Sequence, residues 1–137
     1  MKKIIAIAVC VLASLAGVSA SAQDHATRAN IPFAFYVGNT WVPAGHYIVT
    51  SDAGSSIITV RNLDQAISVM RMAAPAEQSA SSNQMVFDRC GDKLFLRDVL
   101  SQGGRLRVEL PVSKAEKYAE EHQASAGTPT TVYLALR

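Results

Sequence analysis

The sequence has 137 residues, with 13 basic and 11 acidic side chains and a formal net charge of +2. A chain of this length is expected to form one domain with a core large enough to fold without disulfide or metal staples. The excess positive charge comes from Lys2 and Lys3 at the start of the chain. Without them the protein is close to neutral, which excludes the long-range positive field typical of proteins that bind nucleic acid or anionic membranes.

The beginning of the chain has the organisation of a secretory signal peptide. A basic start is followed by an apolar run over residues 4–18 and then by small residues. The apolar run is shorter than the ~20 residues that a transmembrane helix needs. Cleavage is expected after Ala20 or Ala22, with residues 1–22 removed. This predicts a single β-rich domain over residues 23–137 that is periplasmic or secreted and has no membrane span after cleavage.

Cysteine is not expected to form a disulfide within the mature chain. Removal of the signal peptide takes away Cys10 and leaves Cys90 alone, which excludes a disulfide within the chain. Cys90 lies in the segment Asp-Arg-Cys-Gly-Asp, where Asp88 and Asp92 are expected to raise the pKa of the thiol. Three interpretations stay open: an incidental thiol, an intermolecular disulfide that joins a homodimer, or a catalytic nucleophile.

The first half of the mature chain reads as short strands joined by turns. Residues 23–29 are expected to form a loose lead-in, and the apolar alternation over residues 31–37 predicts one strand. Pro32 cannot donate to a strand ladder, so this strand is expected to start at a sheet edge. Gly38 and the Pro-Ala-Gly segment at residues 43–45 predict turns. Further strands are expected at residues 46–50, 57–61, 66–72, 84–89, 93–100, 105–110 and 130–136, with an exposed loop over residues 73–83.

One helix is predicted, at residues 113–122. Ser113 is a helix-capping residue, and Glu116 three positions later completes a capping box. Four side chains share one face at helical spacing, and we expect this face to cover an open edge of the sheet. They are Ala115, Tyr118, Ala119 and His122.

These elements predict an all-β, mainly antiparallel protein. About eight short strands, with one helix before the last strand, are typical of a small β-sandwich or a small barrel. The two architectures are not distinguished by the pattern.

Two motifs early in the mature chain resemble those of a group of short exported bacterial proteins, mainly of acidobacterial genomes. They are I-P-F-A-F-Y-V-G at residues 31–38 and P-A-G-H-Y-I-V at residues 43–49, with further matching pieces at residues 87–96 and 110–116. The resemblance implies export and a β fold. That group has no assigned activity, so the resemblance transfers no catalytic residue, and Cys90 is not part of its pattern.

Aromatic side chains are the candidate binding residues. Tyr36, Trp41, Tyr47 and Tyr133 could line a groove that stacks on sugar rings or on a peptide. Core or cross-strand packing is the alternative interpretation for each of them.

No metal site is predicted. His25, His46 and His122 lack the spacing of metal ligands, and no cysteine cluster accompanies them. Asp88 and Asp98 are each next to an arginine, and ion pairing is the expected role of both. No catalytic residue and no cofactor are predicted.

The expected function is therefore that of a non-enzymatic binding or structural module of the cell envelope, with a protein or glycan partner. The expected mechanism is recognition of an extended chain along a strand edge, near Pro32 or on the last strand, which ends at Leu136. The alternative is a carbohydrate-active or other hydrolase that uses Asp88, Asp92 or His46.

Overall fold

The structure is a computed structural model that describes residues 25–51, 56–77, 82–101, 106–122 and 130–136. The predicted signal peptide, residues 1–22, lies outside the described residues. Within the described part of the chain, no helix has the length and apolar character needed to cross a membrane.

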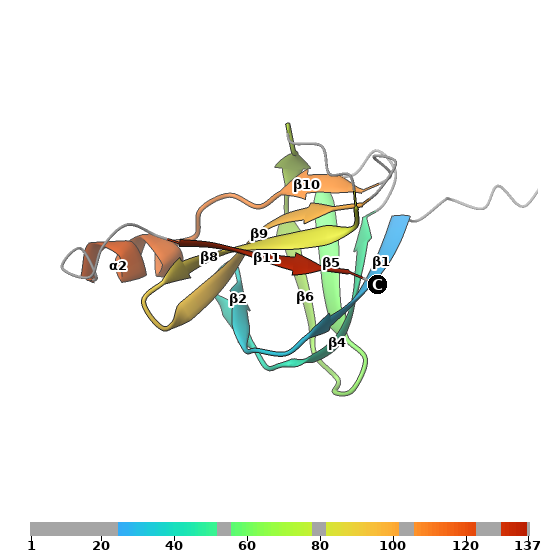
Figure 1. Cartoon of the computed structure of the whole chain (residues 1–137), viewed down its shortest axis with the longest axis horizontal. Coiled ribbons are helices and arrows are strands. Elements are labelled where there is room, and N and C mark those ends of the chain that lie inside the picture. Colours follow the sequence, from blue (N-terminus) through green and yellow to red (C-terminus); the bar gives the residue numbers. More distant parts are fainter. Residues whose placement is uncertain (1–24, 52–55, 78–81, 102–105, 123–129, 137) are drawn as a thin grey trace, which may run out of the picture.

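Two sheets make up the body of the protein (Figure 1). Sheet A is four-stranded, in the order β1-β4-β5-β6, and all its pairings are antiparallel. Its strands are β1 (His25–Ile31), β4 (Gly45–Ser51), β5 (Ile57–Asn62) and β6 (Ser68–Met72).

Sheet B is seven-stranded and mixed. Its main path runs β11-β8-β9-β10-β7, and β2 pairs with both β3 and β9, the β2–β9 pair being parallel. The strands are β2 (Phe35–Val37), β3 (Thr40–Val42), β7 (Ala74–Pro75), β8 (Gln84–Cys90), β9 (Lys93–Leu100), β10 (Arg107–Glu109) and β11 (Thr130–Ala135).

The two sheets curl into a half-barrel, which confirms the predicted all-β class with one helix before the last strand (Figure 1). On one side the chain joins the sheets directly, because β6 and β7 are separated only by Ala73. On the other side β1 and β11 are the end strands of their sheets, and no ladder joins them within the described residues. The half-barrel therefore has one closed side and one open side.

The core fills the space between the inner faces of the two sheets. Strict alternation puts every second residue of β4 inside, so Tyr47 and Val49 have no exposed surface. From sheet B, Phe35 and Phe87 meet at 5.4 Å between ring centroids with an edge-to-face angle of 77°. The fully buried large side chains of this core are Ile31, Phe35, Val37, Val42, Tyr47, Val49, Ile58, Met85, Phe87 and Leu110. Phe95 and Leu100 are also fully buried but belong to two separate small clusters.

The start of the domain differs from the prediction. Residues 25–29 were expected in a loose lead-in, but they belong to β1, which pairs with β4 from His25 to Ile31. The expected single strand over residues 31–37 is two strands, because the chain leaves sheet A after Ile31 and enters sheet B at Phe35. Pro32 lies at this crossing, where its missing N–H is not needed for a ladder. In the expected loop at residues 73–83, the structure places the short strand β7.

The pairing of β8 with β9 contains a β-bulge. Val86 pairs with Asp98 and Phe87 pairs with Leu96, which leaves Arg97 as an extra residue in β9. Two consecutive polar residues, Arg97 and Asp98, therefore lie on the outer face of sheet B.

Helix α2 (Lys114–His122) confirms the predicted helix and its cap. The Ser113 Oγ accepts a hydrogen bond from the Glu116 backbone N–H at 3.1 Å. The predicted buried face is confirmed for Ala119 and partly buried Ala115 but wrong for Tyr118, which is 59% exposed and stacks on the exposed His122 at 3.8 Å. Glu116 and Ala119 are the buried residues of α2, and Ala119 packs on the outer face of sheet B.

Candidate functional site

The outer face of sheet B carries an ion-pair cluster around Arg97. The Arg97 Nε lies 3.2 Å from Asp88 Oδ2, so the ion pair expected for Asp88 is formed across the two strands rather than with its neighbour Arg89. The other guanidinium nitrogens of Arg97 lie 3.5 Å from Glu109 Oε1 and 3.7 Å from Glu116 Oε2. These four residues, which we call the Arg97 cluster, place three carboxylates around a single cation.

Burial of Glu116 and Arg97 increases the energetic effect of this charge imbalance. Glu116 is only 2% exposed, and burial raises the pKa of its carboxyl group; Arg97 opposes this shift, whereas Asp88 and Glu120 add to it. Burial likewise raises the pKa of Asp98, and the neighbouring Glu109 carboxylate adds to this rise. Two buried atoms of the Arg97 cluster have no hydrogen-bond partner among the residues that the structure describes: the Glu116 Oε1 and the Arg97 Nη1. The cluster is therefore short of positive charge and has unused bonding capacity.

Cys90 lies beside this cluster, at the end of β8, and not in an open turn. Its side chain is 4% exposed and packs with Phe95 and Ala119 under helix α2. Burial raises the pKa of the thiol from 9.0 to about 11, and Glu120, Glu116 and Asp88 add to the rise. The expected direction of the shift is confirmed, but its main cause is burial and Asp92 is not among the contributors. A catalytic thiolate is not favoured by these surroundings.

Two glutamates of α2 approach the same thiol. Glu116 and Glu120 are one helical turn apart, so they lie on the same side of α2. A carboxylate oxygen of each and the Cys90 Sγ all lie within 4.8 Å of one another. These three residues are the group in the described part of the chain that could hold a metal ion.

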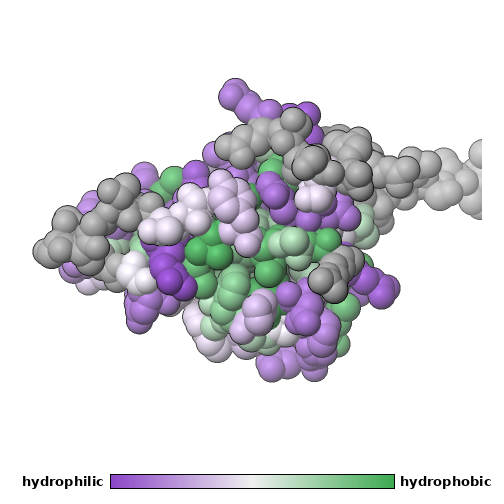
Figure 2. All heavy atoms as spheres, in the orientation of Figure 1, coloured by the Kyte–Doolittle hydropathy of each residue, from purple (hydrophilic) through white to green (hydrophobic). Residues whose placement is uncertain are grey.

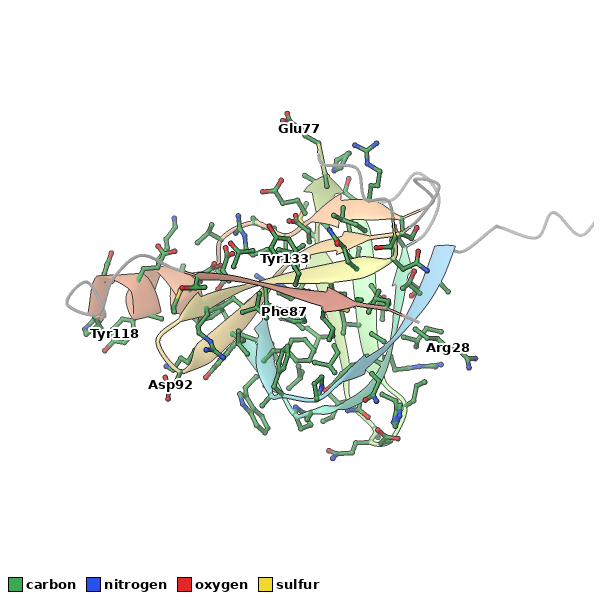
Figure 3. All side chains as sticks on the ribbon, in the orientation of Figure 1. Arg28, Glu77, Phe87, Asp92, Tyr118 and Tyr133 are labelled. Atoms are coloured by element: carbon green, nitrogen blue, oxygen red, sulfur yellow. The ribbon has the colours of Figure 1, made fainter. Side chains whose placement is uncertain are left out.

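Strand β11 forms an edge of sheet B, next to the Arg97 cluster. It pairs antiparallel with β8, and Thr131 lies opposite Asp88 while Tyr133 lies opposite Val86. Thr131, Tyr133 and Ala135 are exposed, whereas Val132 and Leu134 point toward the core. Figure 2 shows apolar side chains gathered on the face that β11 crosses, and Figure 3 shows Tyr133 on this strand.

Edge strands usually carry a device that prevents pairing with another chain, such as a charge, a proline or a bulge. Strand β1, the facing edge, has the charged Arg28 within it and Pro32 directly after it. Strand β11 reads Thr-Thr-Val-Tyr-Leu-Ala and contains none of these devices. Its six residues therefore make an unprotected edge.

The four aromatic residues predicted to bind a ligand do not form one groove. Tyr47 is fully buried, its hydroxyl donates a hydrogen bond to the Pro43 carbonyl oxygen, and its ring packs edge-on against Phe35 at 5.3 Å. It belongs to the core, which is the packing alternative that the sequence left open. Tyr133 is 63% exposed on β11.

Tyr36 and Trp41 are direct neighbours across the β2–β3 pair. Tyr36 is half-buried; its ring stacks on Phe95 at 5.0 Å, and the Lys93 ammonium lies 5.9 Å from the ring centroid. Trp41 is 57% exposed. Strands β8 and β9 separate this pair from Tyr133 on β11.

The three residues of the hydrolase alternative lie in different surroundings. His46 is in sheet A, where its backbone N–H donates to Asp64 Oδ2 at 2.8 Å and its Nδ1 lies 3.0 Å from the same oxygen. These contacts with the His46 backbone and ring lower the pKa of Asp64. Asp88 belongs to the Arg97 cluster of sheet B, and Asp92 is exposed in the β8–β9 turn. The structure does not bring the three residues into one site.

A shallow pocket of about 400 Å³ adjoins the His46–Asp64 pair. Its lining contains no serine, threonine or cysteine to act as a nucleophile: it consists of Arg28, Ala29, Asn30, His46, Tyr47, Leu63 and Asp64. Of the other histidines, His122 is exposed at the end of α2, and the side chain of His25 lies outside the described part of the structure.

No sequence pattern identified Arg97, Glu116 and Glu120 as residues of a functional site. Glu116 was recognised only as a capping residue, and its spacing of four from Glu120 was the available signal. No local pattern reveals that helix α2 packs over Cys90 and approaches Arg97, or that a bulge in β9 places Asp98 on the same face as Arg97.

Comparison of the chain with protein-family models, with curated proteins and with solved structures gave no match. The functional conclusion therefore rests on the geometry of the described residues.

Proposed function

We propose that this protein is an exported, non-enzymatic binding module of the cell envelope that takes up an extended segment of a protein partner as an additional strand beside β11. The observation that carries the proposal is the unprotected edge of β11. The strand has six residues, no charge and no proline, and it borders the open side of the half-barrel.

Strand β11 has the backbone and side-chain groups that the addition of a further strand requires. The backbone groups on its free edge can pair with an extended chain, which gives affinity without regard to sequence. The exposed side chains of Thr131 and Tyr133 lie on one face of the strand and would contact alternate residues of the added strand. Apolar surface beside β11 (Figure 2) supports a partner segment with hydrophobic side chains on the face toward the core.

The predicted signal peptide supports the location in the periplasm or outside the cell. A near-neutral charge supports a partner other than nucleic acid. A polypeptide partner is favoured over a glycan because the candidate aromatic residues are dispersed, whereas the strand edge is continuous. The hydrolase alternative is less well supported, because the pocket beside His46 has no nucleophile in its lining.

A photo-crosslinking experiment in living cells tests the proposal. The full-length protein carries benzoylphenylalanine at Tyr133 or, as a matched control, at Tyr118, which is almost equally exposed at 59% against 63%. We expect a defined adduct with an envelope protein from position 133 and none from position 118.

A second variant pair shows whether strand addition is the mechanism. Tyr133→Lys places a charge on the edge strand and should abolish the adduct formed by a crosslinker at Thr131, because edge lysines oppose strand pairing. Tyr118→Lys should leave that adduct intact. Equal adducts from positions 133 and 118, or an adduct that survives Tyr133→Lys, would contradict the proposal, and an adduct with a second copy would make the partner the protein itself.

A further inference from the structure

Cys90, Glu116 and Glu120 share the geometry of an incomplete metal site. Their three ligand atoms lie within 4.8 Å of one another. In a tetrahedral zinc site the bonds are about 2.3 Å to sulfur and about 2.0–2.2 Å to oxygen, so neighbouring ligands are roughly 3.5 Å apart. A contraction of about 1 Å would bring the three atoms to that spacing.

The three residues differ in how firmly they are held. Cys90 is fixed in a strand and Glu116 in the buried first turn of α2, whereas Glu120 is exposed and its side chain can rotate. Rotation of the Glu120 side chain can therefore bring its carboxylate closer to the other two ligand atoms without any change in the backbone.

A second observation, independent of the spacing, also indicates a missing cation. Glu116 is 2% exposed, and its Oε1 has no hydrogen-bond partner within the described part of the chain. A buried carboxylate oxygen without a partner is costly, and a bound cation would satisfy it. The Arg97 guanidinium does not fill this need, because it also faces Asp88 and Glu109 and its closest approach to Glu116 is 3.7 Å.

We propose that Cys90, Glu116 and Glu120 bind a divalent zinc-type cation that fastens helix α2 to strand β8. One thiolate and two carboxylates are donors that Zn²⁺ accepts, and water would occupy the fourth position. The Sγ–metal bond forms as the thiol releases its proton to solvent, which is how a protonated, buried cysteine becomes a ligand. This site is independent of the strand edge proposed above.

Cobalt titration of the purified full-length protein tests the site. Co²⁺ replaces Zn²⁺ in such sites, and a Co²⁺–thiolate bond gives a charge-transfer absorption in the near ultraviolet. We expect this band in a mildly alkaline buffer with one equivalent of Co²⁺, its displacement by Zn²⁺, and a higher melting temperature with Zn²⁺ than with a chelator.

Three variants, all in a Cys10→Ser background, assign the ligands. Cys90→Ser should abolish the absorption band, and Glu120→Gln should weaken binding by at least about tenfold, the loss typical even of residues that only support a ligand. Glu121→Gln is the matched control, because Glu121 is exposed on the same helix and is not a member of the group. It should bind the metal as the parent protein does.

Glu116→Gln is not used, because Glu116 is buried and its substitution could prevent folding. Glu120 is exposed, so Glu120→Gln tests the carboxylate ligands in a folded protein. Absence of the band in the folded parent protein would overturn the proposal. So would binding that persists in Cys90→Ser, or equal affinities of the Glu120→Gln and Glu121→Gln variants.

Discussion

The Asn39 Oδ1 accepts a hydrogen bond from the Ala115 backbone N–H at 3.0 Å, which connects the β2–β3 turn to the first turn of helix α2. The first N–H groups of a helix have no partner within it, so a side-chain acceptor from another element both satisfies one of them and positions the helix. Together with the Ser113 cap, this contact holds α2 against sheet B.

Removal of this acceptor should loosen the helix. Asn39→Ala should lower the free energy of unfolding by about 1 kcal/mol, the usual value of a capping side chain. Asn39→Asp keeps an acceptor oxygen and should retain most of the stability. Urea denaturation of the three proteins measures the difference, and equal midpoints for the parent and Asn39→Ala would show that the contact is not stabilising.

A side chain at Gly38 should destabilise the protein. Its φ is +63°, and an added Cβ would lie 2.3 Å from the Arg71 Nε. Gly38→Ala should therefore destabilise the protein by more than the ~1–2 kcal/mol of left-handed backbone strain, because the Arg71 side chain must also move. In an Arg71→Ala background the cost should fall to the backbone part alone.

Gly91→Ala is the control for this effect, since Gly91 has a φ of +66° in the exposed β8–β9 turn. It should show only the backbone cost. A Gly38→Ala cost that does not change in the Arg71→Ala background would mean that the guanidinium moves aside freely.

The buried Cys90 thiol should make stability depend on alkaline pH. Its pKa is 9.0 when exposed and about 11 in the folded protein, so the unfolded chain loses this proton first as the pH rises. The thiol should therefore not affect the pH dependence of stability below pH 9, and between pH 9 and pH 11 stability should fall by roughly 2 kcal/mol more than in Cys90→Ala. Urea denaturation over this range, with a chelator present, measures the difference.

Alkylation gives an independent measurement of the same thiol. In the folded protein Cys90 should react with iodoacetamide far more slowly than in urea, because it is both buried and protonated. Peptide mass spectrometry separates its modification from that of Cys10. Equal rates in the two conditions would contradict the burial of Cys90 under α2.

Arg97 should be the most sensitive charged residue of sheet B. Arg97→Ala leaves Asp88, Glu109 and the buried Glu116 without their shared cation, and loss of one partner of a buried pair costs about 3–5 kcal/mol. Because Arg97 is 17% exposed, we expect the lower end of this range.

The defect of Arg97→Ala should be smaller in mild acid, where Glu116, whose pKa is raised, takes up a proton. Arg89→Ala removes an exposed arginine from the neighbouring strand and should change stability little. A loss in Arg97→Ala that is the same at neutral and mildly acidic pH would show that packing, and not charge, is responsible.

The sequence predicted the elements well where a local pattern decides them. The strands expected at residues 46–50, 84–89 and 93–100 and the Ser113 cap all correspond to observed features. The prediction failed where pairing partners decide the structure. Residues 25–29 have no apolar alternation, yet they form a strand because β4 offers them an edge.

The candidate sites were likewise predicted where a local pattern decides them and missed where contacts between distant segments decide them. The last strand was identified as a possible edge because its pattern and position are local properties. The Arg97 cluster was not identified, since it is assembled from β8, β9, β10 and α2, and contacts of that range are not encoded in any short segment. The helix face was assigned correctly for Ala115 and Ala119 but not for Tyr118 and His122, which have the right spacing but stack on each other in solvent.

The bulge at Arg97 gives β9 two halves that are out of phase with each other. If β9 kept its length but lost the bulge, strict alternation would exchange the two faces for one half of the strand, so that Asp98 would turn toward the interior in place of Val99, which has no exposed surface. The bulge therefore keeps Val99 in the core, and loss of Arg97 alone would leave a regular strand with both faces unchanged. Relatives of this protein should vary in length at their loops, and in β9 they should have either this bulge or one residue fewer between Leu96 and Val99.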